Sequence, residues 1–439
     1  MSDIKQQLIN KFQDKTAKIA ILGQGYVGLP LSIVFLDAGF EVVGIDPDQS
    51  KVTKLNQGIS YIDDVPTADV EKYVKTGKFS ATTDFAAIKE SDAVSVCVPT
   101  PLRKTGDPDL SFIVKATQDI KEYLHAGLAV VLESTTYPGT TRELMLPTLS
   151  EDTGFEVGKD FFLAFSPERV DPGREDWTTV NTPKVMGGIT EACSEVCTVW
   201  YEQALDTVFT VTSTEVAEMT KLLENTFRMV NIGLVNELAV MCEHLGIDVW
   251  EVIDAADTKP FGFMKFTPGP GLGGHCIPID PLYLSWKLKA LNYNAKFIEL
   301  ASEINTNMPR YVINRVMNQL NTHGKSLNGS KVLVLGAAYK PDIDDLRESP
   351  ALDIIGLLIE KKADVSYHDP YVPGFSHETW HLDSVPDLMR SVSESDLVVI
   401  VTDHSEYNFK EIVDNAKLIF DSRNATGDYG RKNNKVEFL

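Results

Sequence analysis

The chain has 439 residues, the length of about three ordinary domains, and its 41 Lys and Arg against 63 Asp and Glu leave a formal net charge of −22. This acidic balance argues against nucleic acid or an anionic membrane as the main partner, because both require a basic face on the protein. It does not exclude small anionic ligands, which need only a local cluster of Lys and Arg.

The first segment, Met1–Ala17, is polar and charged and lacks the apolar core of a signal peptide. Its apolar residues recur at helical spacing and predict a short helix that docks on the rest of the protein: Ile4, Leu8, Ile9 and Phe12. No run of about 18 apolar residues occurs, so we expect no transmembrane helix.

The five cysteines form an odd, scattered set that favours the reducing cytoplasm: Cys97, Cys193, Cys197, Cys242 and Cys276. Cys193 and Cys197 lie four residues apart on a predicted helix, but two thiols without a second pair do not favour zinc. We therefore expect no metal site.

Strand and helix patterns alternate over the first 210 residues, which is typical of a doubly wound parallel sheet. The predicted strands there are Lys18–Leu22, Glu41–Ile45, Ala93–Val98, Ala129–Leu132 and Phe162–Phe165. The same alternation returns late in the chain, with strands predicted at Lys331–Leu335, Asp364–His368, Leu397–Val401 and Lys417–Phe420. We predict an α/β protein with two doubly wound, Rossmann-like parallel-sheet domains.

Between these regions, Thr212–Gly246 has no strand signal and predicts one helix about 50 Å long. Thr212 and Glu215 have the spacing of a capping box at its start, and Gly246 suits its end. A long central helix joining two α/β domains suggests a spine and a subunit interface, although a solvent-exposed connector has the same pattern.

The first motif is Gly23-Gln24-Gly25-Tyr26-Val27-Gly28, directly after the first predicted strand and before a predicted helix. Glycines at these positions allow a tight turn, a close approach to a pyrophosphate and close helix–strand packing. Asp46 ends the next predicted strand, where a carboxylate holds a ribose diol, and no Arg follows it to hold a 2′-phosphate. The motif therefore predicts NAD rather than NADP.

The second motif is the Gly- and Pro-rich stretch 269–281, which contains Cys276. A rigid loop of this kind allows backbone to approach a ligand closely. Cys276, with His275 beside it and Asp280 nearby, is a candidate nucleophile, and a buried bystander thiol is the alternative. A Cys–His hydrolase would use the same residues but would not explain the dinucleotide motif.

The long predicted helix carries Lys221 and Asn225 four residues apart, and hence on one face. Lys221 lies beside apolar Leu222 and Leu223, so it could be partly buried and serve in proton transfer or oxyanion stabilisation. Taken alone, a solvated surface lysine explains it as well.

Three further motifs follow predicted strands, where ligands bind in parallel sheets. Glu133–Thr141 offers a cluster of hydroxyls, some of which helix capping would also explain, and Ser166–Gly173 offers paired charges that a surface ion pair would also explain. In 340–350, Lys340 and Arg347 supply positive charge, but the preceding Gly336-Ala337-Ala338 lacks the full glycine motif. A phosphate-bearing ligand other than a second dinucleotide is expected there.

Taken in order, these motifs resemble those of the UDP-glucose/GDP-mannose dehydrogenase family, and the resemblance extends from about Lys18 to Asp421. They are GQGYVG, ESTTYPGTT, SPERVDPG, AEMTKLLENT, PGPGLGGHCIPIDP and DDLRESP. Within the family, the SPERVDPG, KPFGF and cysteine-loop motifs are most similar to those of UDP-N-acetyl-D-glucosamine 6-dehydrogenases. The resemblance implies domains at residues 18–211 for NAD, 212–327 for the central helical part with the cysteine loop, and 328–439 for the UDP-sugar, after an extension at 1–17.

The resemblance also implies site residues. Those matching catalytic positions are Cys276, Lys221, Asn225, Asp280, Glu168 and Thr135. Those expected to bind NAD are Gly23, Gly25, Tyr26, Val27, Gly28, Asp46, Lys51, Thr100, Thr135 and Arg347. Those expected to bind the substrate are Glu168, Arg169, Lys221, Asn225, Lys265, Gly273 and Lys340.

The sequence departs from the family pattern at a few positions. Glu133 stands where UDP-glucose dehydrogenases often have Lys, and Ile279 stands where they tend to have Lys. Many relatives supply an Arg from a partner subunit just before the cysteine loop, where this chain has Lys259 and Lys265. Recognition of the acetamido group and a contact from a partner subunit are therefore left open.

The implied reaction is a two-step, four-electron oxidation of C6 of a UDP-hexosamine through a thiohemiacetal and a thioester on Cys276. UDP-N-acetyl-D-glucosamine is the preferred substrate, with UDP-N-acetylmannosamine, UDP-N-acetylgalactosamine and UDP-glucose as alternatives. The expected setting is a cytoplasmic homodimer or larger homo-oligomer serving surface polysaccharide synthesis. Two other classes remain open: a dehydrogenase that performs a single oxidation, and a non-catalytic NAD-binding sensor.

Overall fold

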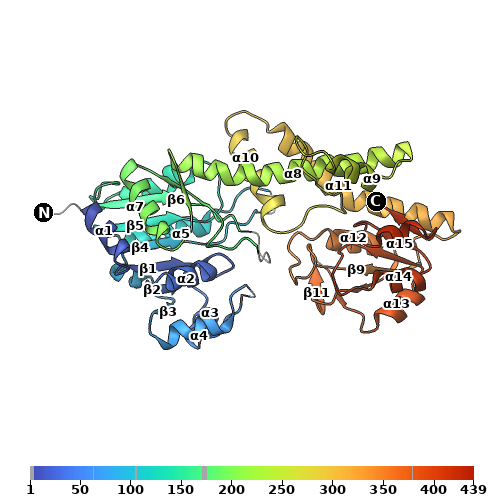
Figure 1. Ribbon diagram of the computed structural model, residues 1–439, viewed down its shortest axis with the longest axis horizontal. Helices are drawn as coiled ribbons and strands as arrows, with labels where there is room; N and C mark the ends of the chain where they lie inside the picture. The colour runs from blue at the N-terminus through green and yellow to red at the C-terminus, as the bar shows by residue number, and fades with distance from the viewer. Residues whose placement is uncertain (1–3, 63, 104–105, 171–175, 378) are drawn as a thin grey trace. The chain divides into compact units, whose positions relative to one another are not determined.

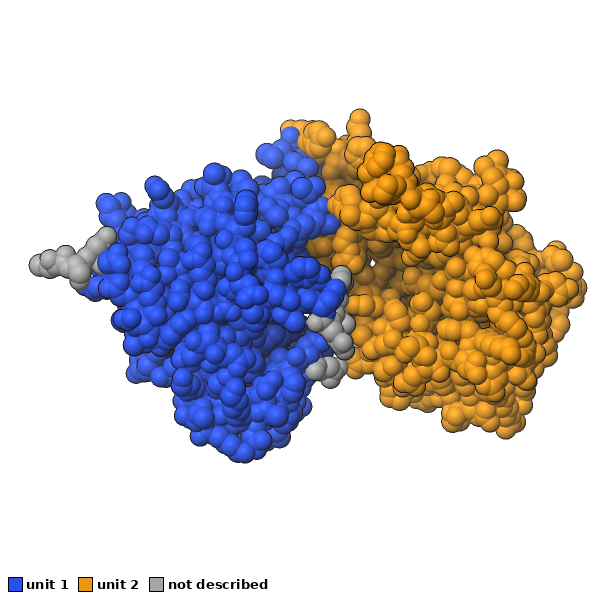
Figure 2. Space-filling model, viewed as in Figure 1, with its two compact units in different colours: residues 1–224, 286–291 blue, residues 225–285, 292–439 orange. Residues whose placement is uncertain are grey.

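The computed structural model describes residues 4–62, 64–103, 106–170, 176–377 and 379–439. The chain forms two compact units, coloured separately in Figure 2. Unit 1 comprises residues 1–224 and 286–291, and unit 2 comprises residues 225–285 and 292–439. Each unit contains a largely parallel sheet with helices on both faces (Figure 1), which confirms the predicted α/β class.

Unit 1 is built on one sheet. Its eight strands are β1 (Lys18–Leu22), β2 (Glu41–Ile45), β3 (Phe79–Thr82), β4 (Ala93–Val96), β5 (Leu128–Leu132), β6 (Phe161–Phe165), β7 (Lys184–Gly188) and β8 (Val208–Val211). Their spatial order is β3-β2-β1-β4-β5-β6-β7-β8. All neighbours pair in parallel except β6 and β7, which are antiparallel and depart from the purely parallel prediction.

Helices cover both faces of this sheet. They are α1 (Ile4–Gln13), α2 (Gly28–Asp37), α3 (Gln49–Asn56), α4 (Thr67–Lys75), α5 (Ser111–Glu122), α6 (Leu146–Ser150) and α7 (Glu191–Glu202), with a 3-10 turn η1 (Phe85–Glu90) and a π turn η2 (Thr141–Met145). Alternate residues of β1 enter two separate cores: Ile19 packs with residues of α1, α2 and α7, whereas Ala20 packs with residues of α5 and α6. This alternation is why a parallel strand reads as a continuous apolar run.

The N-terminal helix forms as predicted. Leu8, Ile9 and Phe12 are buried on one side of α1, which packs on α7. The ring of Phe12 stacks on Trp200 with 5.7 Å between ring centroids. The segment is therefore part of the core of unit 1.

Unit 2 contains a second sheet and a hairpin. The sheet strands are β9 (Lys331–Leu335), β10 (Asp364–His368), β13 (Leu397–Ile400), β14 (Ile419–Asp421) and β15 (Val436–Phe438), and the hairpin strands are β11 (Gly374–His377) and β12 (Trp380–Asp383). The sheet is parallel throughout, in the order β10-β9-β13-β14-β15. The helices of this unit are α9 (Val249–Asp257), α11 (Lys296–Thr322), α12 (Pro350–Glu360), α13 (Leu388–Glu394), α14 (Phe409–Asn415) and α15 (Gly427–Arg431).

Two helices contribute residues to both units: α8 (Thr214–Leu245) and α10 (Cys276–Lys289). The long helix α8 confirms the predicted central helix and ends where expected, because Gly246 has a φ of +69° and Ile247 N–H donates to Cys242 O. The predicted capping box of Thr212 and Glu215 is wrong. Ser213 Oγ accepts the N–H of Val216, and the Glu215 carboxylate instead pairs with Arg142.

Nine predicted strands are present, with ends shifted by at most two residues. The prediction missed β3, β7, β8, β11, β12 and β15. These are short, and several carry polar or exposed residues that break an apolar run. Among the described helices, none combines the length and the apolar character needed to cross a bilayer.

Candidate active site

The glycine turn after β1 has the geometry of a dinucleotide cradle. Gly23 has a φ of +86°, and a Cβ on it would lie 2.4 Å from the carbonyl oxygen of Cys97. A Cβ on Gly28, at the start of α2, would lie 1.8 Å from the carbonyl oxygen of Gly23. By contrast, no atom lies within 4 Å of a Cβ built on Gly25, so the backbone there is open to a ligand. The residues present therefore fit a pyrophosphate at the N-terminus of α2.

Asp46 follows β2 and faces this turn. Its buried carboxylate accepts the N–H of Gln24 and the N–H of Asp48, both at 2.9 Å, and Lys51 Nζ lies 3.4 Å from Oδ2. A carboxylate at this place suits a ribose diol and repels a 2′-phosphate. Beside it, Tyr26 is exposed on the turn, and Val27 is the N-cap residue of α2.

Residues that follow neighbouring strands complete the carboxyl edge of the unit 1 sheet. Thr100 lies beyond β4 and is buried, and Thr135 lies beyond β5 and is half-buried. Ser134 is buried, and its hydroxyl donates to the carbonyl of Val98 at 2.7 Å. These residues follow the carboxyl ends of parallel strands, which is where ligands bind in open α/β sheets.

Glu168 follows β6, and a lysine that the motifs did not reveal contacts it. Lys184 Nζ lies 3.1 Å from Glu168 Oε2 and 2.5 Å from Glu133 Oε2. Burial opposes the charge on Lys184, but the two carboxylates raise its pKa above the ordinary value. In the sequence, Lys184 is marked only by its place as a charged residue at the start of an apolar stretch. Residues 171–173 of the same motif lie outside the described residues.

The guanidinium of Arg169 is directed away from its neighbour Glu168, although the Arg169 N–H donates to Glu168 Oε1. Its guanidinium makes two hydrogen bonds with the carboxylate of Glu224 on α8, at 2.6 and 3.3 Å, and donates to the carbonyl of Pro183 at 2.5 Å. Arg169 therefore ties the loop after β6 to α8. Its predicted sugar contact remains a prediction.

The first turns of α8 carry functional candidates that are buried. Lys221 is only 8% exposed and Asn225 only 5%, so the alternative of a solvated surface lysine is wrong. One turn before Lys221, the buried Glu218 carboxylate accepts the N–H groups of Gly139 and Thr141 at 2.5 and 2.9 Å. Glu218 therefore fixes the loop after β5 to α8. The sequence analysis assigned no role to Glu218.

In unit 2, Cys276 is the first residue of α10 and is exposed. A helix N-terminus favours negative charge, which suits a thiolate. One turn later, Asp280 is buried, and Asn225 Nδ2 donates to its Oδ2 at 2.6 Å. A direct hydrogen bond thus connects two of the predicted catalytic residues, Asn225 and Asp280.

The cysteine loop is built against the loop that carries Lys340 and Arg347. A Cβ on Gly273 would lie 2.4 Å from the Cβ of Tyr339, and Gly274 N–H donates to the carbonyl of Arg347 at 2.9 Å. These contacts explain why the loop requires glycine. The side chain of Lys340 is half-buried.

Two predicted ligand-binding cations have acidic neighbours. The Arg347 guanidinium makes a two-point contact with Asp345, and Lys265 Nζ lies 2.7 Å from Asp254. Both cations are exposed, and such surface pairs are weak enough to exchange for a ligand anion. The predicted roles of Arg347 and Lys265 remain predictions.

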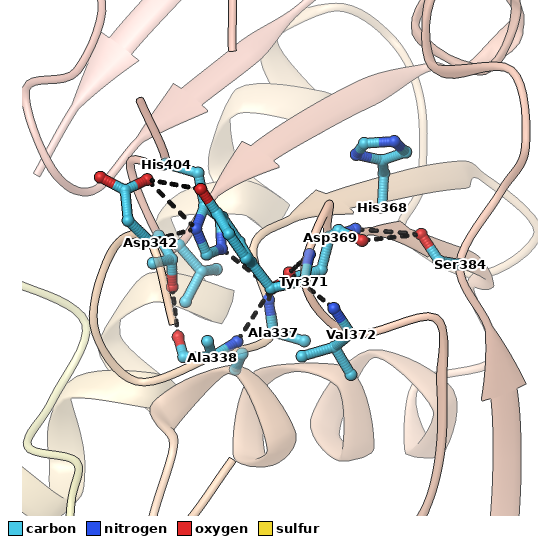
Figure 3. Close-up of polar contacts among 12 residues, drawn as sticks. Ala337, Ala338, Asp342, His368, Asp369, Tyr371, Val372, Ser384 and His404 are labelled. Carbon is cyan, nitrogen blue, oxygen red and sulfur yellow. Dashed lines mark hydrogen bonds and ion pairs between the residues drawn. The ribbon is translucent and has the colours of Figure 1, made fainter. Parts of the chain in front are cut away.

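Figure 3 shows Asp369, the residue that directly follows β10, as Asp46 directly follows β2 in unit 1. Asp369 Oδ2 accepts the N–H groups of Ala337 and Ala338 and bonds His404 Nε2 at 2.9 Å. Its Oδ1 accepts the N–H groups of the residues two and three positions further on. Although burial opposes ionisation, His404 and the two loop amides lower the pKa of Asp369. Protein donors occupy this carboxylate, and the expectation that unit 2 binds something other than a second dinucleotide stays a prediction.

The remaining cysteines have structural positions. Cys193, Cys197 and Cys242 are buried, and burial raises the pKa of Cys97 well above its ordinary value. Within the described residues, no group of three or more His, Cys, Asp or Glu could hold a metal ion.

Comparison with known proteins agrees with this arrangement. Three models of the UDP-glucose/GDP-mannose dehydrogenase family match in order: the NAD binding domain over residues 17–205, the central domain over 215–307 and the UDP binding domain over 333–428. A UDP-N-acetyl-D-mannosamine dehydrogenase of Pyrococcus horikoshii is 36% identical over 414 residues, covering 93% of this chain and 95% of the relative. A UDP-N-acetyl-D-glucosamine 6-dehydrogenase of Pseudomonas aeruginosa is 34% identical over 395 residues, covering 90% and 92%.

Among solved structures, the UDP-D-ManNAc dehydrogenase of Pyrococcus horikoshii matches with a TM-score of 0.87 and 34% identity, covering 96% of this chain and 98% of that one. The match spans both sheets and the long helix. With the cradle at Gly25 and the three family domains in order, the chain belongs to the UDP-glucose/GDP-mannose dehydrogenase family, as an NAD-dependent UDP-sugar dehydrogenase.

Proposed function

We propose that this protein oxidises C6 of a UDP-N-acetylhexosamine, preferably UDP-N-acetyl-D-glucosamine, from the alcohol to the carboxylate. The observation that carries the proposal is the exposed Cys276 thiol at the start of α10, one turn from the buried Asp280–Asn225 pair. An oxidation that stops at the aldehyde needs no thiol. A thiol that adds to the aldehyde allows a second oxidation at the same carbon.

The cofactor that suits unit 1 is NAD, held by the glycine turn at 23–28, Asp46 and the N-terminus of α2. When bound, NAD⁺ accepts two electrons from C6 in each of two oxidations, so one turnover uses two NAD⁺ and one water and releases the carboxylate, two NADH and three protons.

Residues of the chain carry out proton transfer, nucleophilic addition and oxyanion stabilisation. Lys221 and Asp280, through water, accept the proton of the C6 hydroxyl. The Cys276 thiolate then adds to the aldehyde carbon to form a thiohemiacetal, and the second oxidation leaves a thioester. Lys221 and Asn225 stabilise the oxyanions.

The last step is hydrolysis of the thioester. Glu168, Thr135 and Asp280 position the attacking water, the carbon–sulfur bond breaks, and Cys276 returns as the thiol. Loss of the thioester makes the reaction effectively irreversible. The uronate product suits the synthesis of a surface polysaccharide.

The sugar is proposed from the motifs. SPERVDPG, KPFGF and the cysteine loop support UDP-N-acetyl-D-glucosamine. UDP-N-acetyl-D-mannosamine is a second candidate, because several similar curated relatives, at 34 to 36% identity, bear that substrate in their names. Relatives named for the glucosamine substrate are 33 to 34% identical, so overall identity does not separate the two.

The test is a panel of UDP-glucose and the UDP derivatives of N-acetylglucosamine, N-acetylgalactosamine and N-acetylmannosamine, followed by NADH absorbance. We expect two NADH per sugar and the highest kcat/KM with UDP-N-acetyl-D-glucosamine. One NADH per sugar would indicate a single oxidation, and no NADH with any sugar would favour a sensor. Cys276→Ser should abolish uronate formation and leave NAD binding intact, and normal turnover by this variant would refute the covalent mechanism.

A further inference from the structure

In unit 1, Glu168 belongs to a buried ion-pair cluster whose other two members, Lys184 and Glu133, have no part in the steps above. Lys184 contacts the carboxylates of Glu133 and Glu168 at 2.5 and 3.1 Å. The side chains of Lys184 and Glu133 are 3% and 0% exposed, whereas that of Glu168 is 17% exposed. Two buried charged groups are expensive unless geometry compensates them, and removing one leaves the other uncompensated.

Strand topology brings this cluster together. The strand β7 pairs antiparallel with β6, with Ala164 opposite Gly188 and Phe165 opposite Gly187. Continued past the end of β6, the same register places Lys184 opposite Glu168. Glu133 directly follows β5, the other neighbour of β6. The one antiparallel pair of the sheet thus places a lysine between two carboxylates from neighbouring strands.

The contacts hold Glu168 in one orientation. Its Oε1 accepts the N–H groups of Arg169 and Val170, both at 2.7 Å, and its Oε2 faces Lys184. Burial opposes ionisation, yet Lys184 and Val170 N–H, with a smaller contribution from Lys221, lower the pKa of Glu168. Lys184 is the cation in direct contact.

Glu133 is held in turn from the opposite side. The Tyr201 hydroxyl on α7 donates to Glu133 Oε1 at 2.6 Å and lies 3.3 Å from Ser95 Oγ. Burial, followed by the charge of Glu133, raises the pKa of Tyr201, so this hydroxyl stays protonated as a donor. Burial also raises the pKa of Glu133, while Lys184 opposes that increase.

We propose that Lys184 and Glu133 are positioning residues for the hydrolytic step: Lys184 orients Glu168 and keeps it as a carboxylate, and Glu133 fixes Lys184 and moderates its charge. This inference rests on the proposed function, in which Glu168 acts on the attacking water. The charged and titratable groups around Glu168 are Lys184 from β7, Glu133 after β5, Lys221 from α8, Cys97 after β4, whose thiol has its pKa raised by burial, and Arg169, which is itself paired with Glu224.

The two positioning residues have opposite electrostatic effects on Glu168, and this makes the proposal testable. In Lys184→Met, Glu168 loses its cation and keeps an anionic neighbour, so its pKa rises. In Glu133→Gln, the charge of Lys184 acts on Glu168 alone, so the pKa falls. Opposite charges within about 4–6 Å shift carboxyl pKa values by about 1–3 units, so both shifts are measurable.

The experiment is the pH profile of steady-state turnover, with pre-steady-state NADH formation, for wild type, Lys184→Met, Lys184→Arg and Glu133→Gln. We expect the acid limb to move up by about one unit or more in Lys184→Met and down in Glu133→Gln. Lys184→Met should retain a rapid burst of two NADH per site but turn over about 10- to 100-fold more slowly, because general acid–base contributions are of this size or larger. KM for the UDP-sugar should change little, and Lys184→Arg should restore turnover.

The matched control is Lys159→Met, which removes an exposed lysine paired with Glu156 in the same unit and should leave the profile unchanged. Acid limbs that move in the same direction, or not at all, would overturn the inference. If Lys184→Met does not fold, the downward shift in Glu133→Gln and the behaviour of Lys184→Arg still decide it.

Glu168→Gln separates this inference from the proposed function. If that variant hydrolyses the thioester normally, the role of Glu168 is wrong. If it stalls while the Lys184 and Glu133 variants keep the wild-type profile, only the positioning role is wrong. A ¹³C NMR titration of the Glu168 carboxyl, assigned with Glu168→Gln, measures the two pKa shifts without any turnover.

Discussion

Glu218→Gln tests how the active-site loop after β5 is held to α8. The Glu218 carboxylate is fully buried and accepts three hydrogen bonds, from Gly139 N–H, Thr141 N–H and the Thr141 hydroxyl. Burial is the largest influence and raises its pKa to about 7, although the three donors oppose the rise. The folded protein therefore binds a proton between the ordinary carboxyl pKa and about 7, where the unfolded chain does not.

The direction in which stability changes with pH follows from this proton uptake. A carboxyl whose pKa is raised in the folded state stabilises the fold least when it is ionised, so stability falls as pH rises through this window, by about 1.4 kcal/mol per pH unit. Between pH 5.5 and pH 8 the contribution of Glu218 should fall by about 2 kcal/mol. Glu218→Gln does not titrate and should lack this loss.

The assay is urea unfolding of both proteins at pH 5.5, 6.5, 7.2 and 8, followed by tryptophan fluorescence. The difference in unfolding free energy between the two proteins should change by about 2 kcal/mol across this range in favour of the variant at high pH. Parallel profiles, with the difference constant to within about 0.5 kcal/mol, would refute the reasoning and mean that the three donors keep Glu218 ionised.

Three other predictions concern the ligand-binding edges. Asp46→Asn should reduce the preference for NAD over NADP by about tenfold or more, as measured by dissociation constants, because the carboxylate no longer repels a 2′-phosphate; an unchanged ratio would contradict it. Gly273→Ala should lower the free energy of unfolding by about 1–3 kcal/mol and reduce turnover, because its Cβ would lie 2.4 Å from a neighbouring side-chain carbon. The control Gly356→Ala has open space around it and should be neutral or slightly stabilising in urea unfolding. His404→Leu should destabilise unit 2 by about 1–3 kcal/mol, because the buried Asp369 carboxylate loses one of its hydrogen-bond partners, whereas exposed His381→Leu should leave the melting temperature nearly unchanged; equal melting temperatures would contradict this.

The sequence predicts the parts of this fold that local pattern determines. The strands β1, β2, β9 and β10 begin and end at the predicted residues, and the first three do so because each is a short, mostly apolar run bounded by turn residues. The cradle at Gly23 and the stop at Gly246 are predicted because both need a positive φ. Lys184 escapes prediction because its contacts depend on the antiparallel register of β7, a strand that the sequence pattern did not reveal.

Whether a charged side chain is buried likewise depends on tertiary packing. Nothing in the sequence near Lys221 separates a buried lysine from a surface one, and the residue is enclosed only once α8 packs in place. The capping error at Thr212 has a local cause. Ser213 is an equally good N-cap one residue later, and spacing alone favoured the pair that included Glu215.

The packing of the cysteine loop on Tyr339 has a consequence for the order of events in catalysis. Under the proposed function, the sugar carbon stays bonded to Cys276 while one spent cofactor leaves and a fresh one enters. The nucleophile, its loop and Lys340 all belong to unit 2, whereas the glycine cradle and Asp46 belong to unit 1. The covalent bond to Cys276 would therefore retain the half-oxidised sugar in unit 2 while the cofactor exchanges at the glycine cradle of unit 1, so the exchange need not release a reactive aldehyde.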